Sequence, residues 1–345
     1  MKILFISPLG FAVNQDSRYL GIEKLVYQFS AELIKEHQVT VMGRADSIYA
    51  QSVEVLPTTI LSSEDTNYSG EAKQFREHQS FLRNFDVIHD FSHQHLASRF
   101  LPNLPSLNIF WHAPALAQYP KAPYNIIALS RWAAREFQRI YHQKAQYQQS
   151  ICVDVDVYKP LGEPRNDRFL VVGRMGEEKG NLNAASICAD LGVPLDIITA
   201  RGAERADAPY SDYEKQVMAL ADGDKIKLWW EQDYTEASKI KMMQTNKALL
   251  YITDHPEVTS HKIQESLLCG QPVIVPNLGA LPEIVTQGID GFLCRTEKEY
   301  MDAIQGVDQL KPEKTYQQTK AIYSIENVVK GYLPLYKSVA EGLRW

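Results

Sequence analysis

Short apolar runs alternate with amphipathic stretches along this chain of 345 residues. This alternation is typical of repeated β-α units, which fold into a parallel sheet with helices on both faces. The stretch 21–36 carries apolar side chains at helical spacing, and it predicts a helix. The apolar runs of the first half are 3–7, 39–42, 87–89, 107–111 and 126–129. The sequence therefore predicts an α/β fold.

The pattern pauses at residues 158–168, YKPLGEPRNDR, and then begins again. Two prolines, a glycine and mixed charges are typical of a linker. New apolar runs follow at 169–173, 195–199, 226–228, 248–253, 273–275 and 291–294. The length of the chain also favours two domains. We therefore expect two doubly wound domains, 1–160 and 161–324, followed by a helical segment at 325–345.

Composition and charge argue against several classes of protein. A formal net charge of −6 disfavours a nucleic-acid binder that works by neutralising phosphates. No apolar run reaches the length of about 18 residues that spans a bilayer, and the chain opens on a strand pattern instead of a signal peptide. The cysteines, Cys152, Cys188, Cys269 and Cys294, are scattered and form no Cys-x-x-Cys pair. We expect a cytoplasmic protein with free thiols.

Two carboxylates, Glu257 and Glu265, are the strongest indication of chemistry. They stand eight positions apart, between apolar runs at 248–253 and 272–276. If the residues between them are helical, both lie on roughly one face, about 12 Å apart at ~1.5 Å per residue. Such acceptors suit a ligand with hydroxyl groups at two places, for example a nucleotide sugar. A solvated helix face with a carboxylate near its N-terminus is the alternative.

The segment 172–180, VGRMGEEKG, places two cations directly after a strand. Open α/β sheets bind ligands at the carboxyl ends of their strands, where Gly173, Arg174 and Lys179 are expected to lie. Arginine grips a phosphate through two hydrogen bonds and lysine supplies a compact charge, so a diphosphate fits. The alternative is an ordinary turn with solvated charges, and the nearby pair of glutamates weighs against it.

Taken in order, these motifs resemble those of the retaining family four glycosyltransferases, which have the GT-B fold. The resemblance continues through CGQPV (269–273), GALPEIV (279–285) and GIDG (288–291). The first half agrees more loosely, at GIEKLV (21–26), DVIH (86–89), ALS (128–130) and 153–160. The resemblance implies two Rossmann-like domains that face each other across a cleft. Residues 1–160 would carry the acceptor, 161–324 would bind the sugar nucleotide, and helix 325–345 would pack back on the first domain.

The resemblance also implies roles for the candidate residues. Arg174 and Lys179, beside Gly173, would hold the donor diphosphate. Glu265 would accept hydrogen bonds from the nucleotide ribose, and Glu257 from hydroxyls of the donor sugar. The reaction would be a hexosyl transfer that retains the anomeric configuration and uses neither a metal nor another cofactor.

Four further positions follow from the resemblance. His112 matches a histidine beside the transferred sugar, although a capped histidine at a strand end is an alternative. Gly21 would let the backbone approach the phosphates at a helix start, unless it is a plain helix-start glycine. Ser260 and His261 would donate main-chain N–H groups to the phosphates. They belong to VTSH (258–261), where the family usually has Gly-Phe-Gly-Leu. The loss of these glycines leaves open an unusual donor or a loss of catalysis.

Two other groups of side chains have weaker functional interpretations. The segment 89–95, HDFSHQH, gathers three histidines and Asp90, but no distant Cys or His motif completes a metal site. We therefore expect no metal there. The stripe Arg131, Arg135 and Arg139 is compatible with peripheral contact to an anionic membrane, although a solvated helix face is favoured.

The expected partners are a UDP-, GDP- or ADP-sugar donor and a glycan, lipid or small-molecule acceptor. Two alternatives stay open. One is a catalytically silent GT-B protein that binds a sugar nucleotide or a partner glycosyltransferase. The other is a different enzyme on the same fold, such as a sugar-nucleotide epimerase or a phosphorylase. The phosphorylase is disfavoured because no motif identifies a lysine for a pyridoxal Schiff base.

Overall fold

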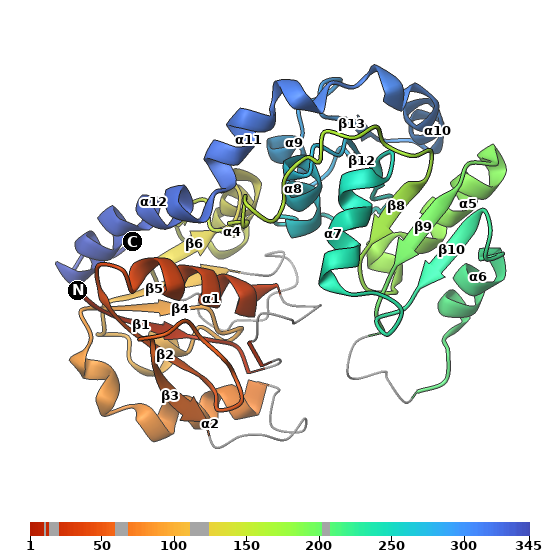
Figure 1. Ribbon diagram of the computed structural model, residues 1–345. Helices are drawn as coiled ribbons and strands as arrows, with labels where there is room; N and C mark the ends of the chain where they lie inside the picture. Colours follow the sequence, from red (N-terminus) through yellow and green to blue (C-terminus); the bar gives the residue numbers. More distant parts are fainter. Residues whose placement is uncertain (10–11, 14–20, 59–67, 111–123, 202–207) are drawn as a thin grey trace. The chain divides into compact units, whose positions relative to one another are not determined.

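The computed structural model describes residues 1–9, 12–13, 21–58, 68–110, 124–201 and 208–345 (Figure 1). It divides into two compact units. The first comprises Met1–Cys152 with Tyr323–Trp345, and the second comprises Val153–Ile322. Each unit is built on one parallel sheet with helices on both faces, so the predicted α/β fold class is confirmed.

The sheet of the first unit has seven parallel strands in the order β3-β2-β1-β4-β5-β6-β7. The strands are β1 (Lys2–Ile6), β2 (Gln38–Arg44), β3 (Glu54–Thr58), β4 (Val87–Asp90), β5 (Ser106–Phe110), β6 (Ile126–Ala128) and β7 (Ala145–Tyr147). The helices are α1 (Ile22–Leu33), α2 (Tyr68–His78), α3 (Leu96–Phe100), α4 (Arg131–Tyr141) and α12 (Ile325–Ala340), with a 3-10 turn at Phe81–Asn84. In the part of the chain that the structure describes, no helix has both the length and the apolar character needed to cross a membrane.

Burial on both faces explains why a continuous apolar run identifies β1. Ile3, Leu4 and Phe5 are all 0% exposed, although successive side chains of a strand point to opposite faces of the sheet. In α1, by contrast, the buried side chains recur at helical spacing and include Val26 and Phe29. Strand β1 is therefore apolar at successive positions because both of its faces are buried. Helix α1 is apolar at helical spacing because only one of its faces is buried.

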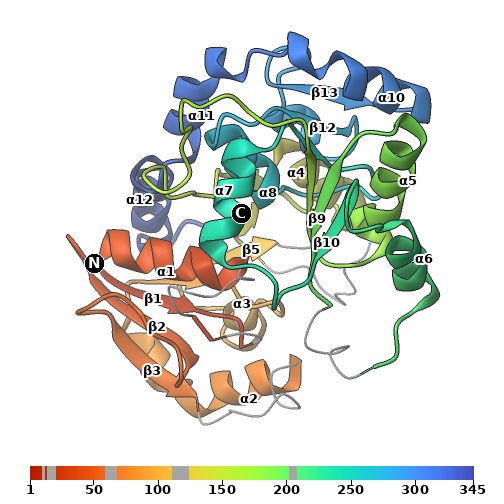
Figure 2. The ribbon, with the colours of Figure 1, turned by 45° about the vertical axis from the view of Figure 1, so that its right-hand side comes forward.

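Helix α12 lies beside α1 in both views (Figures 1 and 2). Tyr336 of α12 forms a 2.8 Å hydrogen bond with His89 Nδ1 on β4, and Tyr332 bonds to Ser150 Oγ. The ring of Tyr332 also packs edge-on against Phe29, with centroids 5.2 Å apart. These buried contacts hold the last helix of the chain on the first unit.

The sheet of the second unit has six parallel strands in the order β10-β9-β8-β11-β12-β13. The strands are β8 (Phe169–Val172), β9 (Leu195–Ile198), β10 (Ile226–Trp229), β11 (Leu249–Leu250), β12 (Val273–Pro276) and β13 (Gly291–Cys294). The helices are α5 (Asn181–Leu191), α6 (Asp212–Leu220), α7 (Glu236–Thr245), α8 (His261–Leu268), α9 (Leu281–Ile284), α10 (Glu297–Gly306) and α11 (Tyr316–Tyr323). Short 3-10 turns occur at Glu177–Lys179, Val307–Gln309 and Pro312–Lys314.

The helices of the second unit cover both faces of its sheet. Helices α5 and α6 lie on one face and α7 on the other, in both views (Figures 1 and 2). The chain runs outward from β8 through β9 to β10, and β11 then pairs with the opposite side of β8. This reversal is a topological switch point, where the carboxyl ends of neighbouring strands leave a crevice for ligands. In this unit the crevice is expected between the ends of β8 and β11.

The structure differs from the predicted strands in a few places. Strands β3 and β7 and helices α2 and α3 were not predicted. The apolar run 248–253 forms a strand only at Leu249–Leu250. Its end turns toward α5, because the carbonyl of Ile252 accepts a 3.1 Å hydrogen bond from Asn183 Nδ2. The Ile252 carbonyl oxygen therefore bonds to a side chain of α5 instead of to a neighbouring strand.

Replacing Gly180 with alanine is expected to destabilise the second unit by more than about 2 kcal/mol. Gly180 has a φ of +68°, and an added Cβ would lie only 1.9 Å from the carbonyl oxygen of Ile252. Gly223 is a matched control because its φ is +77° and nothing lies within 4 Å of an added Cβ. Gly223→Ala should therefore cost only about 1 kcal/mol. Thermal unfolding of both variants tests this, and equal losses would contradict the proposed close packing.

Candidate functional site

An ion pair between Lys179 and Glu257 lies at the switch point of the second sheet. Lys179 ends the 3-10 turn that follows β8, and Glu257 follows β11. Lys179 Nζ is 2.8 Å from Glu257 Oε1, and the two side chains are 23% and 22% exposed. The buried hydroxyl of Tyr251 donates a hydrogen bond to the same carboxylate oxygen. The pair is therefore oriented from two strands and still reaches solvent.

The electrostatic surroundings keep Glu257 ionised. Burial acts to raise the pKa of Glu257, but the ammonium groups of Lys179 and Lys262 outweigh it. Hydrogen bonds from Lys179 and Tyr251 act in the same direction, so the pKa lies below its ordinary value. The pKa of Tyr251 is raised by burial and by the neighbouring carboxylate, so its hydroxyl keeps its proton. A charged acceptor of this kind suits sugar hydroxyls.

The prediction that Glu257 and Glu265 share one helix face is wrong. Helix α8 begins at His261, so only Glu265 is on it. The carbonyl of Glu257 accepts a 2.9 Å hydrogen bond from Ala280 N, and it is thereby used in a loop contact instead of starting the helix. Gly279, with a φ of +62°, permits this contact because an added Cβ would lie 2.6 Å from the same carbonyl oxygen.

Glu265 lies in a separate group of buried charges. Its Oε2 is 3.7 Å from Lys239 Nζ, and the side chains of Glu265 and Lys239 are 11% and 10% exposed. Lys239 also pairs with Glu236 at 3.0 Å, and Glu236 accepts a 2.5 Å hydrogen bond from the hydroxyl of Tyr158. Burial acts to lower the pKa of Lys239, but the two carboxylates outweigh it and raise the pKa. The two candidate glutamates therefore pair with different lysines.

Arg174 and Gly173 occupy the turn after β8. Arg174 Nη2 is 3.6 Å from Glu178 Oε1, and both side chains are about 40% exposed, so the guanidinium pairs with Glu178 instead of Glu257. An added Cβ on Gly173 would lie 3.7 Å from the side chain of Lys179 and 3.3 Å from Lys262 Nζ. The glycine therefore leaves room for two lysine side chains.

Lys262 is a site residue that the sequence analysis missed. Its Nζ lies 3.5 Å from the centroid of the Tyr251 ring, and burial together with Lys179 lowers its pKa to about 7. One signal was present in the sequence. Lys262 stands in the first turn of a helix, between two glutamates, whereas helix N-termini favour acidic side chains. Helix stability alone therefore does not explain a cation at this position.

The other predicted residues are placed as follows. Ser260 is the N-cap of α8 and His261 is its first residue, so both stand where main-chain N–H groups lack partners within the helix. Gly21 is the N-cap of α1 in the first unit. His112 lies outside the described residues. Of the predicted residues, the structure brings Gly173, Lys179 and Glu257 together.

The histidine-rich segment after β4 makes internal contacts. His89 Nδ1 bonds to Tyr336, and His95 Nε2 lies 2.9 Å from the carbonyl oxygen of Ile109. Asp90 accepts 2.8 Å hydrogen bonds from the main-chain N–H groups of Ser92 and Ala97. Burial outweighs these bonds and raises the pKa of Asp90 to about 6. These contacts give the segment a structural role at the end of β4.

The basic stripe of α4 is partly engaged with its neighbours. Arg131 lies over the ring of Tyr147, 5.0 Å from its centroid, and Arg139 pairs with Glu136 at 2.7 Å. The helix begins at a Ser130 N-cap, as predicted, because the Ser130 hydroxyl accepts a hydrogen bond from Ala133 N.

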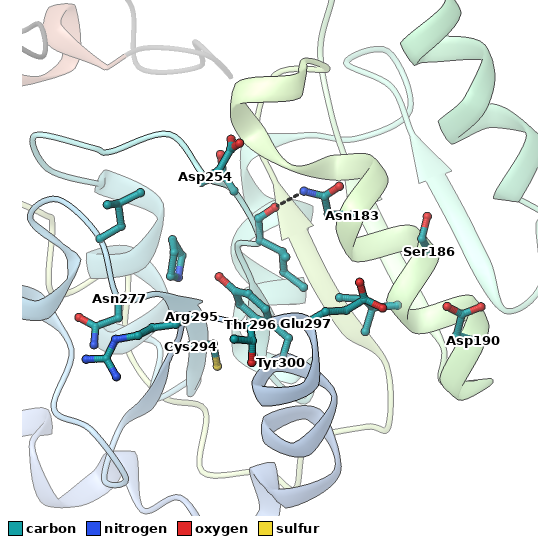
Figure 3. Close-up of a pocket in the computed structure, with 15 residues that line it drawn as sticks. Asn183, Ser186, Asp190, Asp254, Asn277, Cys294, Arg295, Thr296, Glu297 and Tyr300 are labelled. Carbon is teal, nitrogen blue, oxygen red and sulfur yellow. Dashed lines mark hydrogen bonds between the residues drawn. The ribbon is translucent and has the colours of Figure 1, made fainter. Parts of the chain in front are cut away.

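A second location in this unit also has room for a ligand (Figure 3). This pocket of about 520 Å³ lies between α5 and α10, at the carboxyl ends of β12 and β13. Its polar lining includes Asn183, Asp190, Asp254, Arg295 and Glu297, and Asn183 bonds to the Ile252 carbonyl at its edge. None of the predicted donor residues lines it. The Lys179–Glu257 pair and this pocket are therefore two different candidate sites.

Comparisons with known proteins agree with the fold. The family model described as Glycosyl transferases group 1 matches residues 159–324. A search of curated protein sequences finds no match. Among solved structures, sucrose-phosphate synthase from Thermosynechococcus elongatus has a TM-score of 0.77 at 14% identity, over 99% of this chain and 100% of the other.

Two further solved structures are similar over nearly the whole chain. HepE from Anabaena, in complex with UDP-glucose, has a TM-score of 0.74 at 15% identity, with 98% of this chain and 100% of the other covered. AviGT4, a glycosyltransferase involved in avilamycin A biosynthesis, has a TM-score of 0.72 at 16% identity, with 100% and 99% covered. At sequence identities this low, the similarity shows only that the fold is shared. The chain therefore has the GT-B fold seen in these glycosyltransferases, and its residues 159–324 match the family model of the group 1 glycosyl transferases.

Proposed function

We propose that this protein transfers a hexosyl group from a nucleotide diphosphate sugar to an acceptor hydroxyl, with retention of configuration at the anomeric carbon. The observation that carries the proposal is the Lys179–Glu257 pair at the switch point of the second sheet. An ammonium and an ionised carboxylate stand there side by side, one suited to phosphate and the other to sugar hydroxyls. The pair also falls inside the segment that matches the glycosyl transferase family.

Donor binding is assigned to the second unit. Lys179 and Arg174 would contact the diphosphate, together with main-chain N–H groups of Ser260 and His261 at the start of α8. Glu257 would accept hydrogen bonds from the donor sugar, and Glu265 from the ribose. HepE, which has the same fold, is described in complex with UDP-glucose, and this supports a nucleotide sugar as the donor. The acceptor is then assigned to the first unit.

The proposed chemistry is a front-face displacement. The acceptor oxygen forms a bond to the anomeric carbon while the bond from that carbon to the donor phosphate oxygen breaks. The proton of the acceptor hydroxyl passes to the departing phosphate. Lys179 and Arg174 stabilise the negative charge that develops on the diphosphate, which is the kind of electrostatic contribution that usually dominates catalysis.

Activity is expected to survive an excess of EDTA. The cationic side chains around the diphosphate would do the work that a divalent ion does in other transferases. The measurement is donor turnover before and after chelation, with Mn²⁺ and Mg²⁺ added back in turn. Complete loss on chelation, restored by either ion, would contradict metal independence.

Two further assignments complete the proposal. The four cysteines are free and buried, which supports a reducing, cytoplasmic location. The exposed part of the Arg131, Arg135 and Arg139 stripe supports peripheral contact with an anionic membrane when the acceptor is a lipid.

A thermal-shift screen of UDP-, GDP- and ADP-sugars is the first test. A ligand present at 100 times its dissociation constant should stabilise the protein by about 2.7 kcal/mol. Turnover of the labelled donor, with and without acceptor, then separates the remaining candidates. Transfer supports the proposal, and isomerisation alone indicates an epimerase. Binding without turnover indicates the silent protein, which the VTSH sequence at 258–261 favours.

A further inference from the structure

Lys262 occupies a position that helix stability does not explain. It is the second residue of α8, close to the positive end of the helix dipole, where a cation is disfavoured. Within the part of the chain that the structure describes, its ammonium forms no ion pair and donates no hydrogen bond to another side chain. Its close neighbour is the face of the Tyr251 ring, 3.5 Å from Nζ to the centroid.

One cation and two carboxylates act on the ammonium of Lys262. Lys179, on the 3-10 turn after β8, opposes the protonated form of Lys262, whereas Glu257 and Glu178 favour it. Glu257 is already paired with Lys179 at 2.8 Å, and Glu178 is paired with Arg174 at 3.6 Å. Both neighbouring carboxylates therefore have another cationic partner. An anion that arrives between Lys179 and Lys262 would relieve their mutual repulsion.

The backbone leaves space for such an anion. Gly173, at the end of β8, has no side chain, and an added Cβ would lie only 3.3 Å from Lys262 Nζ. The first turn of α8, which contains Lys262, also carries main-chain N–H groups of the kind that bind anions at helix starts. The ring of Tyr251 lies against the ammonium of Lys262, and the hydroxyl of Tyr251 donates a hydrogen bond to Glu257. Lys262 and Glu257 therefore both contact Tyr251, and Glu257 is the residue that the proposed function assigns to the donor sugar.

We propose that Lys262 is a donor-binding residue, whose ammonium contacts the diphosphate opposite Lys179 and takes up a proton when the donor binds. This inference rests on the proposed function, because it assumes that a nucleotide sugar is the ligand. It adds a residue to the site and makes donor affinity depend on pH.

The direction of the pH dependence follows from the state of Lys262 before binding. Its pKa is about 7 in the free protein, because burial and Lys179 lower it. A bound diphosphate would raise that pKa. Well below pH 7 the ammonium is protonated in both states, so affinity is constant. Above pH 7 binding must draw a proton from solvent, and affinity should fall by up to roughly tenfold per pH unit.

Few other groups in the site titrate in the same range. The pKa of Glu257 is lowered and that of Tyr251 is raised, so both keep their charge state near neutrality. The diphosphate of a nucleotide sugar is esterified at both ends and carries no group that titrates there. His261, the residue before Lys262 on α8, belongs to a residue type that does titrate near neutrality. A His261→Gln variant is therefore needed as a control.

The test is calorimetric titration with whichever of UDP-glucose, GDP-mannose and ADP-glucose binds in the thermal-shift screen. Titrations at pH 8 in buffers of different ionisation enthalpy give the number of protons taken up. The wild-type protein and His261→Gln should take up close to one proton for each donor. Lys262→Met should take up none and bind roughly 10- to 150-fold more weakly at pH 6.5. Lys262→Arg, which stays charged, should bind without proton uptake and with an affinity that no longer falls above pH 7.

The possible results distinguish a failure of this inference from a failure of the proposed function. Lys241→Met is the control for loss of a surface lysine, because Lys241 is 57% exposed on α7, and it should behave as wild type. If Lys262→Met keeps wild-type affinity and proton uptake while Lys179→Met loses affinity, the role of Lys262 is overturned and the donor site stands. If no nucleotide sugar binds at either pH, the proposed function and this inference fall together.

Discussion

Replacing Lys179 with methionine is expected to lower kcat/KM for the nucleotide sugar by roughly 10- to 150-fold. A hydrogen bond to a charged group contributes about 1.5–3 kcal/mol, and Lys179 is assigned one to the diphosphate. The substitution also removes the partner of Glu257 at 2.8 Å and the strongest influence that lowers the pKa of that carboxyl. Both effects weaken the same site. Steady-state kinetics with varied donor measures the loss.

The matched control is again Lys241→Met, because Lys241 lies on the exposed side of α7 and pairs only loosely with Glu163, at 3.6 Å. It should leave kcat/KM unchanged. Unfolding temperatures of the two variants should agree within a few degrees, because Lys179 is a partly exposed residue. A Lys179→Met protein that is folded and keeps the wild-type kcat/KM would rule out the diphosphate assignment.

The two glutamates are expected to differ in kinetic effect. Glu257→Gln should mainly lower kcat, because a carboxylate beside the donor sugar gains importance as positive charge develops at the anomeric carbon. Glu265→Gln should raise the donor KM more than it lowers kcat, because a ribose contact serves ground state and transition state alike. Each loss should be roughly 10- to 150-fold in kcat/KM, as for other charged hydrogen bonds.

Protein stability is the control for this comparison. Glu265→Gln removes one partner of a buried ammonium, but Lys239 keeps Glu236 at 3.0 Å, so the fold should persist. Circular dichroism on both variants checks that point before kinetics are compared. Identical kinetic changes in the two variants would contradict the division of roles. Unchanged kinetics in both would favour the silent binder.

The central strands of the sheets were predictable because they are buried on both faces. The first four positions of the run 3–7 are all apolar, and the structure has Ile3, Leu4 and Phe5 fully buried in β1. Strand β7 (Ala145–Tyr147) could not be recognised in this way. Its residues are only partly buried, so no continuous apolar run marks it. Edge strands of this kind depend on pairing with a neighbour that the sequence does not reveal.

The site was only partly predictable, for a different reason. Lys179 and Glu257 were identified from local motifs, and the structure joins them because β8 and β11 are neighbours in the sheet. The shared helix face was wrong, because the contact of Glu257 with Ala280 links residues 23 positions apart. Lys262 was missed because its significance depends on Tyr251 and Lys179, which are distant in sequence.

Hydrogen–deuterium exchange with and without the bound nucleotide sugar tests the central claim most directly, because it locates the donor. Peptides that cover 173–181 and 257–266 should gain protection, since they carry Lys179, Glu257 and the start of α8. Peptides that cover the pocket between α5 and α10 report on the competing location (Figure 3). Protection confined to 183–190 and 294–300 would place the ligand in that pocket and contradict the assignment of the donor to the Lys179–Glu257 pair.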